Sequence, residues 1–547
     1  MDDSVAHADP GDTAGAPHEL MAQLGRAVQA QDFPTAFRLA AEAVAAGASD
    51  PLPYRLHGAD LDRQGRSAEA VGMLRRALSF APQDAATLNA LGLSLGKLGR
   101  LAEATATLVS AARLAPGFAP IRFNLGHVLE SQGRLAAAEE AYGEAVRLDP
   151  DHVHAMAALA VLHARRSRWA LARHQAEAAL TKAPSLAAAR LAMAMADLGE
   201  GRLDAAKAGL EGLLARPDLP PQERAVSFNL LGEVLDRRGE AAAAYSAYSS
   251  ANSGFRRLFG AAAAGGPPTG LSLVRQLQVA MQDPGLAFPQ AAQAPDAPAF
   301  LLSFPRSATT LTGQILAAHP DVVVSDEQEL LAEAGLAYLA PADGLRRLAD
   351  AEPLSLDDAR RTYWRRVRDL GLEVTGKRFV DKLPMNTLAL PVIARLFPGA
   401  RIVFMVRDPR DVVWSCFRQR FIGSGVARSF TDLQETAALY DAVMTFARTC
   451  LDKLDLQVRF QSYESLVADF DGEVAALCGF LDLAPGAALA DFAGGVGARD
   501  VATPSAVQIA RGLNAGSIGQ WRRYGGPMAE VLPRLAPWVE AFGYAPA

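Results

Sequence analysis

The sequence predicts a multidomain protein in which an all-α array of repeats precedes an α/β domain with a parallel sheet. Three observations predict this fold class. A period of 34 residues runs through the first half of the chain, and a stretch rich in glycine, proline and alanine follows it. From residue 299 onward, short apolar strands alternate with amphipathic helices. With 547 residues, the chain is also too long for a single hydrophobic core.

Composition sets broad limits on the class of protein. The formal net charge of −6 and the 50% of hydrophobic residues are ordinary for a globular protein and give no sign of nucleic-acid binding. The acidic N-terminal stretch lacks the features of a signal peptide, and no run of eighteen apolar residues occurs, so we expect a cytoplasmic protein without a membrane span. Cys416, Cys450 and Cys478 form no CxxC pair, which favours buried thiols over disulfides.

Four columns of residues hold the 34-residue period. Gly-Arg pairs begin at Gly65, Gly99 and Gly133, and Ser167 continues this series. Three further columns keep the same step: small residues at Gly58, Gly92, Gly126 and Ala160, alanines at Ala70, Ala104, Ala138 and Ala172, and prolines at Pro82, Pro116, Pro150 and Pro184. Small residues let two helices pack closely, glycine accepts a positive φ at a helix end, and proline stops a helix before the next unit.

This pattern resembles the tetratricopeptide repeat, which implies a solenoid of helical hairpins. We expect six or seven units over residues 18–255, with a degenerate first unit, after a disordered tail at 1–17. Two interpretations of the repeats stay open: a concave surface that binds a peptide or protein partner, and a helical spacer without a ligand. Residues 256–298 are predicted to be a linker that contains a bridging helix at 271–282.

Residues 299–547 are predicted to form the α/β domain. Its expected strands are 299–304, 322–324, 378–381, 401–406 and 456–459. The first strand runs into Pro305-Arg306-Ser307-Ala308-Thr309-Thr310, and an amphipathic run follows. A strand that leads into a hydroxyl-rich turn at the start of a helix is a common site for phosphate. The glycines and the lysine of a P-loop are absent, which argues against a kinase.

A second anion-binding motif follows the strand at 401–406. It reads Arg407-Asp408-Pro409-Arg410-Asp411 and continues into a helix that carries Ser415. Ligands bind at the carboxyl ends of parallel strands, and the arginine fork meets two phosphate oxygens at once. Arg407 and Ser415 can therefore converge on a second phosphate. A surface ion pair of Arg407 with Asp408 or Asp411 is the alternative interpretation.

Together, PRSATTL and RDPRDVVWS resemble the motifs of sulfotransferases that use 3′-phosphoadenosine 5′-phosphosulfate (PAPS), most closely the tyrosylprotein sulfotransferases and their bacterial relatives. The resemblance covers residues 299–544 and implies a P-loop-like fold that works without a metal ion. It implies that the 5′-phosphosulfate is held by Arg306, Ser307, Ala308, Thr309 and Thr310, and the 3′-phosphate by Arg407 and Ser415. Ala308 stands where the family usually has glycine.

The same resemblance implies roles for the remaining site residues. The segment HPDVVVSDEQELL places the catalytic base at Glu327, with Asp326 as the neighbouring candidate. VDKLPMN places a lysine that assists transfer at Lys382, and Arg306 shares this catalytic role by neutralising the developing charge. YESLV places an adenine-contacting tyrosine at Tyr463. A loop that closes over the cofactor is matched by Ser505, Arg511, Asn514 and Trp521. The alternative role of Glu327 is a carboxylate at the start of a helix.

The predicted function is therefore PAPS-dependent transfer of a sulfuryl group to a hydroxyl acceptor. A protein tyrosine is one candidate acceptor, with the repeats as its docking surface, and a glycan or a small molecule is another. The alternative from a different class is a repeat scaffold whose C-terminal domain binds the nucleotide without catalysing transfer. Arg306, Lys382, Arg407 and Ser415 indicate that the cofactor site is kept, and Glu327 weighs against an inactive domain.

Overall fold

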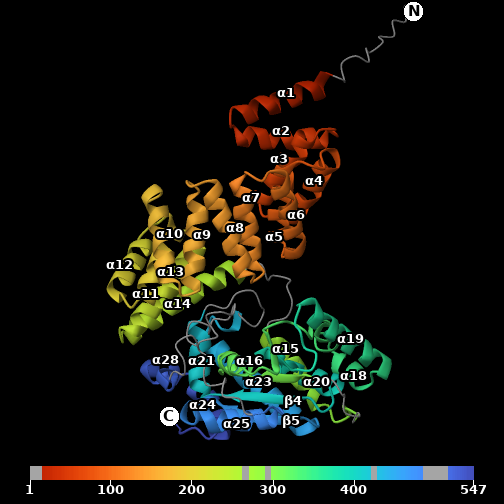
Figure 1. Cartoon of the computed structure of the whole chain (residues 1–547), viewed down its shortest axis with the longest axis vertical. Coiled ribbons are helices and arrows are strands. Elements are labelled where there is room, and N and C mark those ends of the chain that lie inside the picture. Colours follow the sequence, from red (N-terminus) through yellow and green to blue (C-terminus); the bar gives the residue numbers. More distant parts are fainter. Residues whose placement is uncertain (1–14, 261–269, 290–296, 420–427, 485–514, 547) are drawn as a thin grey trace, which may run out of the picture. The chain divides into compact units, whose positions relative to one another are not determined.

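The computed structural model describes residues 15–260, 270–289, 297–419, 428–484 and 515–546 (Figure 1). The chain divides into two compact units, Met1–Ala196 and Asp197–Ala547. Within the described ranges, no helix combines the length and the apolar composition that crossing a bilayer requires. The predicted fold class is confirmed, since a helical repeat array is followed by a parallel-sheet domain.

Consecutive helices of the first unit form antiparallel hairpins. They are α1 (Gly15–Gln29), α2 (Phe33–Ala45), α3 (Pro51–Arg63), α4 (Ser67–Phe80), α5 (Ala85–Lys97), α6 (Leu101–Leu114), α7 (Ala119–Ser131), α8 (Leu135–Leu148), α9 (Val153–Arg165), α10 (Trp169–Lys182) and α11 (Ala187–Gly199). The hairpin pattern continues in the second unit with α12 (Leu203–Leu214), α13 (Pro221–Arg237) and α14 (Ala241–Gly260). Within the described residues, the contacts pair α1 with α2, α3 with α4, α5 with α6, α7 with α8, α9 with α10, and α13 with α14. The predicted number of six or seven units stays a prediction.

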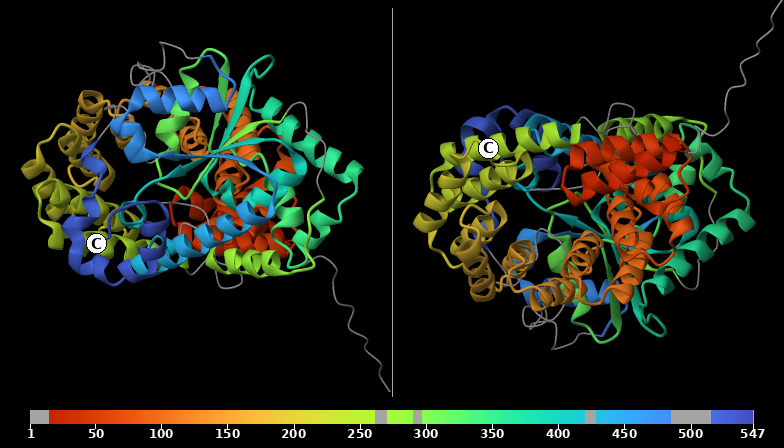
Figure 2. Two further views of the ribbon diagram at one scale, coloured as in Figure 1. Left: turned by 90° about the horizontal axis from the view of Figure 1, so that it is seen from below. Right: turned by 90° about the horizontal axis from the view of Figure 1, so that it is seen from above.

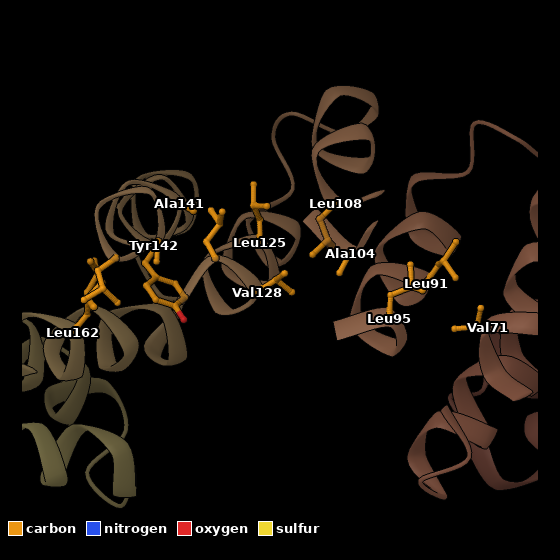
Figure 3. Close-up of a cluster of buried hydrophobic side chains, with 14 of the residues drawn as sticks. Val71, Leu91, Leu95, Ala104, Leu108, Leu125, Val128, Ala141, Tyr142 and Leu162 are labelled. Carbon is orange, nitrogen blue, oxygen red and sulfur yellow. The ribbon is translucent and has the colours of Figure 1, made fainter. Parts of the chain in front are cut away.

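The small-residue column of the repeats marks the contact between the two helices of each hairpin. A Cβ atom at Gly126 would lie 2.6 Å from Cδ1 of Tyr142, and one at Gly92 would lie 2.5 Å from Cγ of Leu108. In the next unit, the column holds Ala160, and its partner Ala176 is also small; the two alanines pack in one cluster. Figure 3 shows Leu108 and Tyr142 in the core cluster that continues from one hairpin to the next. The column therefore holds glycine where its partner is leucine or tyrosine, and it accepts alanine where the partner is alanine.

The predicted turn glycines have the expected conformation. Gly65, Gly99 and Gly133 have φ values of 81°, 73° and 74°. Ser167, which takes the same place in the next unit, has φ 58°. The turn therefore requires a left-handed backbone at this position. Ser167 adopts it as well, although serine has a Cβ atom and glycine does not.

Replacement of Gly126 by alanine is expected to destabilise the repeats. The new methyl group meets the ring of Tyr142, which is 1% exposed and is held at its hydroxyl by Glu130 at 2.9 Å. Overpacking of this kind costs roughly 1–3 kcal/mol. The matched control is Gly143→Ala in α8, where a Cβ atom has no neighbour within 4 Å and alanine should stabilise the helix by about 0.5–1 kcal/mol. Urea unfolding of both variants measures the difference, and equal effects would contradict the packing argument.

The second unit contains a five-stranded sheet in which all pairs are parallel. Its strands are β1 (Ala299–Leu302), β2 (Val322–Asp326), β3 (Arg378–Lys382), β4 (Arg401–Val406) and β5 (Gln457–Ser462), in the order β2-β3-β1-β4-β5. The five predicted strands are all present, and their ends differ by a few residues. The first is shorter than predicted because Ser303 leaves the ladder and donates its N–H to the carbonyl of Pro384 at 3.1 Å.

Helices cover both faces of the sheet (Figure 2). Leu301 and Val403 face a cluster with Leu316 and Leu477, whereas Phe300 points the other way and meets Tyr363 and Phe397.

The remaining described helices of this unit are α15 (Gly270–Gln282), α16 (Thr309–Ala317), α17 (Ala332–Tyr338), α18 (Gly344–Ala349), α19 (Pro353–Asp369), α20 (Leu390–Leu396), α21 (Pro409–Arg418), α23 (Leu433–Lys453), α24 (Tyr463–Ala468), α25 (Phe470–Phe480), α28 (Gly525–Ala529) and α29 (Leu532–Ala541). Short 3₁₀ helices are η2 (Pro384–Ala389), η4 (Ala515–Ser517) and η5 (Gln520–Tyr524). The three cysteines of the chain are buried and unbridged, as predicted.

The last hairpin of repeats belongs to the same compact unit as the sheet. Asn252 on α14 donates to the carbonyl of Phe417 on α21 at 2.9 Å, and Tyr245 stacks on Phe417 with ring centroids 5.6 Å apart. The bridging helix α15 is also packed, because Lys453 donates to the carbonyl of Met281 at 2.6 Å. The boundaries after 255 and 298 are predictions from sequence texture, and they stay predictions. By contacts, the chain divides at 196/197.

Candidate active site

The side chains predicted from the motifs lie at the carboxyl end of the sheet. β1 leads into the loop with Arg306, β2 ends at Asp326, β3 ends at Lys382, and Arg407 follows β4. In a parallel sheet these ends share one edge, which is where ligands bind in open α/β folds. The register places Asp326 directly opposite Lys382. Four segments far apart in the sequence therefore contribute to one site.

The loop after β1 is pinned at its start and strained at two positions. Ser303 donates its hydroxyl to the carbonyl of Met405 at 2.6 Å, which fixes the loop against β4. Arg306 and Ala308 have φ values of 70° and 74°, in the left-handed region. This conformation costs a residue with a Cβ roughly 1–2 kcal/mol, and such strain concentrates at functional sites. Ser307 and the first two residues of α16, Thr309 and Thr310, are buried beside these two positions.

Arg306 is a buried cation with cations for neighbours. Its Nε donates to Oγ of Ser415 at 2.9 Å. Burial lowers the pKa of Arg306 to about 10, with further lowering by Arg418 and Arg407 and opposition from Glu327. The guanidinium is still charged at neutral pH, but it lies in surroundings that favour an anion beside it. This loop can therefore bind phosphate or sulfate through charge as well as through its hydroxyls.

Arg407 is tied to the same loop. It donates to the carbonyl of Arg306 at 3.1 Å and to that of Ser517 at 2.7 Å, and its guanidinium lies 5.0 Å from the ring centre of Tyr463. Its Nε is buried without a hydrogen-bond partner. The surface-pair interpretation does not fit this geometry, because Asp408 forms its ion pair with Arg410 at 2.8 Å.

The contacts of Ser415 differ from the expected pairing with Arg407. Ser415 bonds Arg306, and Arg407 approaches the same point through the Arg306 backbone. The predicted 5′ and 3′ motifs are thus joined in the structure. Asp411, which the motif contains but the sequence left without a role, accepts from the backbone N–H of Gly519 at 2.6 Å and of Trp521 at 3.0 Å.

Lys382 lies between two carboxylates. It is 1% exposed, its Nζ is 3.0 Å from Oε1 of Glu327, and it also forms an ion pair with Asp326. Glu327 has φ 53° and donates its backbone N–H to the carbonyl of Lys382 at 2.9 Å. The helix-start interpretation of Glu327 is wrong, since α17 begins at Ala332. His319 is engaged by backbone groups, with Nε2 2.8 Å from the carbonyl of Ala484.

The predicted adenine and loop residues are only partly described. Tyr463 is buried, and its hydroxyl lies 2.7 Å from Oγ of Ser517. Trp521 is buried under Arg410, whose guanidinium is 4.4 Å from the indole ring centre. The other three residues assigned to the closing loop, Ser505, Arg511 and Asn514, lie outside the described residues.

Ala308→Gly is expected to stabilise the protein. Glycine adopts φ 74° without the steric cost that alanine has there, so the expected gain is roughly 0.5–1 kcal/mol after the larger entropy of the unfolded glycine. The control Ala317→Gly in α16 should lose about the same amount, because that position is helical. Denaturant unfolding checks both signs. A loss at Ala308 as well would mean that the methyl group contributes packing that outweighs the strain.

The buried carboxyl of Asp381 gives a pH dependence of stability. Burial raises its pKa from 3.8 to about 7, while its Oδ2 accepts a hydrogen bond from the Tyr363 hydroxyl at 3.0 Å. The folded state therefore holds this proton more tightly than the unfolded state, and stability falls as the pH rises from about 4 to about 7. Each pKa unit is worth about 1.4 kcal/mol.

Asp381→Asn should remove this dependence, so that the difference in melting temperature between the variant and the wild type changes between about pH 4 and about pH 7 and is constant above it. The exposed carboxylate variant Asp343→Asn gives the baseline for a simple loss of charge. Parallel curves for Asp381→Asn and the wild type would contradict the raised pKa.

Two segments of the chain match known families. Residues 298–485 match the Sulfotransferase family, and residues 123–187 match the Tetratricopeptide repeat. An uncharacterized protein of Aquifex aeolicus (strain VF5) is 25% identical over 335 residues, which are 60% of this chain and 43% of that protein. The chain thus matches less than half the length of this relative.

Two further similarities were found, one to a curated protein and one to a solved structure. Protein-tyrosine sulfotransferase 1 of Danio rerio is 26% identical over 266 residues, which are 45% of this chain and 72% of that protein. Among solved structures, a tetratricopeptide repeat protein from Parabacteroides merdae has 18% identity and a TM-score of 0.36, and the similarity covers 44% of this chain and 93% of that one. The chain therefore matches the Tetratricopeptide repeat in its helical part and the Sulfotransferase family in the part that contains the sheet.

Proposed function

We propose that the protein transfers a sulfuryl group from PAPS to a hydroxyl acceptor. The observation that carries this proposal is the arrangement at the sheet edge, where buried Arg306 and Arg407 adjoin a Lys382–Glu327 pair 3.0 Å apart. The arginines supply sites for anions, and the pair supplies a cation with a carboxylate that is 37% exposed. A domain that only bound a nucleotide would have no use for the second element. This favours the enzyme over the inactive scaffold.

The residues present fit a nucleotide with two separate anionic groups, a 5′-phosphosulfate and a 3′-phosphate. Arg306 with Ser307, Ala308, Thr309 and Thr310 would hold the 5′-phosphosulfate. Arg407 and Ser415 would hold the 3′-phosphate, with Tyr463 beside the base. The buried and partnerless Nε of Arg407 supports this assignment, because a buried donor without an acceptor is costly unless a ligand completes it. Ser505, Arg511 and Asn514 remain further candidates for the nucleotide.

The donor, when bound, supplies an activated sulfuryl group on a phosphate leaving group. Arg306 and Lys382 would stabilise the negative charge that moves toward the leaving phosphate, so that the proposal uses side-chain cations and no metal ion. Glu327 would accept the proton of the acceptor hydroxyl. Lys382 orients the Glu327 carboxylate through their ion pair. When the donor is bound, the Lys382 ammonium group would instead contact the sulfuryl oxygens.

Glu327 is a better candidate for the base than Asp326. Its backbone is held in the left-handed region by a bond to Lys382, a strain that an ordinary surface residue does not carry. Its side chain is also the more exposed of the two, 37% against 29%, so that it can reach an incoming acceptor. Asp326 lies in the ladder of β2 and forms an ion pair with the buried Lys382.

The acceptor is proposed to be a hydroxyl of a protein, with tyrosine as the first candidate. The name of the Danio rerio relative and the presence of repeats that can dock a peptide or protein support this choice. A tyrosine hydroxyl, with an unperturbed pKa of about 10, gains from a carboxylate base at neutral pH. A glycan or a small alcohol would need the same base, so the acceptor class has to be measured.

The test of the proposal is transfer of labelled sulfate from PAPS by the full chain to a tyrosine peptide, a phenol, a sugar and an alcohol. Glu327→Gln keeps the shape of the side chain and removes proton acceptance. It should lower kcat by roughly 10²–10⁴ and leave the Kd for 3′-phosphoadenosine 5′-phosphate within about two-fold, since a base on the acceptor side makes no bond to the nucleotide.

The matched control is Asp326→Asn, which should weaken transfer less. Normal turnover by Glu327→Gln together with a strong loss of turnover in Asp326→Asn would move the base to Asp326. Nucleotide binding by the wild type without transfer to any acceptor class would favour the inactive scaffold instead.

A further inference from the structure

The hairpin α13–α14 is joined to the helix that carries Ser415. Trp414 on α21 has Tyr248 of α14 at its edge, with ring centroids 6.0 Å apart, and Asn229 of α13 donates to the carbonyl of Arg418 at 3.0 Å. Trp414 and Tyr248 are each among the largest fully buried side chains of the protein. The last repeat therefore forms part of the wall behind the proposed nucleotide site.

One carboxylate lies at the centre of this contact. Asp236, near the end of α13, has a side chain that is only 7% exposed. Its Oδ2 is 3.0 Å from Nη1 of Arg418, and its Oδ1 is 2.9 Å from Nη2 of Arg523. The hydroxyl of Tyr524 also donates to Oδ1, and Arg523 donates to the backbone carbonyl of Asp236 at 3.2 Å. Two cations and a phenol thus depend on one buried acceptor.

The contact with Arg418 leads to Arg306. Arg418 is the last residue of α21, one helical turn beyond Ser415, and Ser415 accepts from Nε of Arg306. The charge of Arg418 is also close enough to act on the pKa of Arg306. Since Asp236 neutralises Arg418, it sets both the place of the helix end and the charge that Arg306 experiences.

The contact with Tyr524 leads to Arg407. Tyr524 belongs to η5 and stacks on Trp414 with ring centroids 3.7 Å apart. The segment before it is bound to Asp411 through the N–H groups of Gly519 and Trp521, and the carbonyl of Ser517 accepts from Arg407. Asp236 therefore holds the second segment that positions an arginine of the site.

We propose that Asp236 is a positioning residue of the nucleotide site, through which the last repeat holds Arg306 and Arg407 in place. This inference rests on the proposed function, because it takes the two arginines as the nucleotide ligands. Loss of the carboxylate leaves Arg418 buried without its counter-ion beside Arg306, and it frees Tyr524 and Arg523 from α13. Both arginines then lose part of their support, although Asp236 itself touches no ligand.

The experiment measures binding of 3′-phosphoadenosine 5′-phosphate to the full chain by calorimetry, together with the melting temperature. Asp236→Asn should raise the Kd by about ten-fold, which corresponds to roughly one hydrogen bond. Tyr524→Phe keeps the stack on Trp414, removes only the bond to Asp236 and should raise the Kd by about three-fold. The double variant should show less than the product of the two effects, since both act through one carboxylate.

Two controls separate positioning from general stability. Asn252→Ala removes a bond of α14 to the Phe417 carbonyl at the same contact, and Asp197→Asn removes a buried carboxylate that pairs with Arg202 within the repeats. Both should lower the melting temperature and keep the Kd within about two-fold.

The outcomes distinguish this inference from the proposed function. A wild type that does not bind the nucleotide overturns the proposed function. A binding wild type with unchanged Kd in Asp236→Asn and Tyr524→Phe overturns only the positioning role. A Kd raised equally by Asn252→Ala and Asp236→Asn also overturns it, because docking of the whole hairpin would then matter and not the carboxylate. If Asp236→Asn does not fold, Tyr524→Phe alone decides.

Discussion

Buried positive charge at the carboxyl edge of the sheet is the constraint on which the second unit depends. Arg306, Arg407, Arg410 and Lys382 are all nine-tenths or more buried. An unpaired buried cation costs several kcal/mol, so each one has to be compensated by a carboxylate, a carbonyl or a ligand. Asp408 forms an ion pair with Arg410, and Asp326 and Glu327 form ion pairs with Lys382. Arg407 donates to the carbonyls of Arg306 and Ser517, and Arg306 donates to the hydroxyl of Ser415.

This constraint explains why the carboxylates of the unit lie where they do. Asp411 accepts from two backbone amides of the segment after residue 515, and Asp236 accepts from the residues at the ends of α21 and η5. Burial raises the pKa of Asp411, and its hydrogen bonds from the backbone of Trp521 and Gly519 oppose this rise. The site is thus supported by a second set of charges that never meets the ligand.

The repeats serve two purposes in this chain. In the first unit, Gly58, Gly92 and Gly126 each pack against a large side chain of the next helix, and a core cluster continues from one hairpin to the next. In α13 and α14 the same geometry recurs, with Gly232 under Tyr248, but Tyr248 also meets Trp414 of α21. One repeat has become part of the wall of the sulfotransferase-family domain. A cut placed at the linker would therefore expose Trp414 and Phe417.

The sequence by itself determined the repeats, the five strands, and the residues that gather at their ends. Period and alternation depend on local chain geometry, and parallel strands bring their carboxyl ends together whatever lies between them. Ala308 could also be recognised as an unusual residue, although its φ of 74° came from the structure.

What only the tertiary structure decided were contacts between residues far apart in the chain. The bond between Ser415 and Arg306, the two carboxylates around Lys382, and the role of Asp236 depend on side chains from different elements. No periodicity marks Asp236, because a buried carboxylate in a repeat looks in sequence like any polar residue near a helix end.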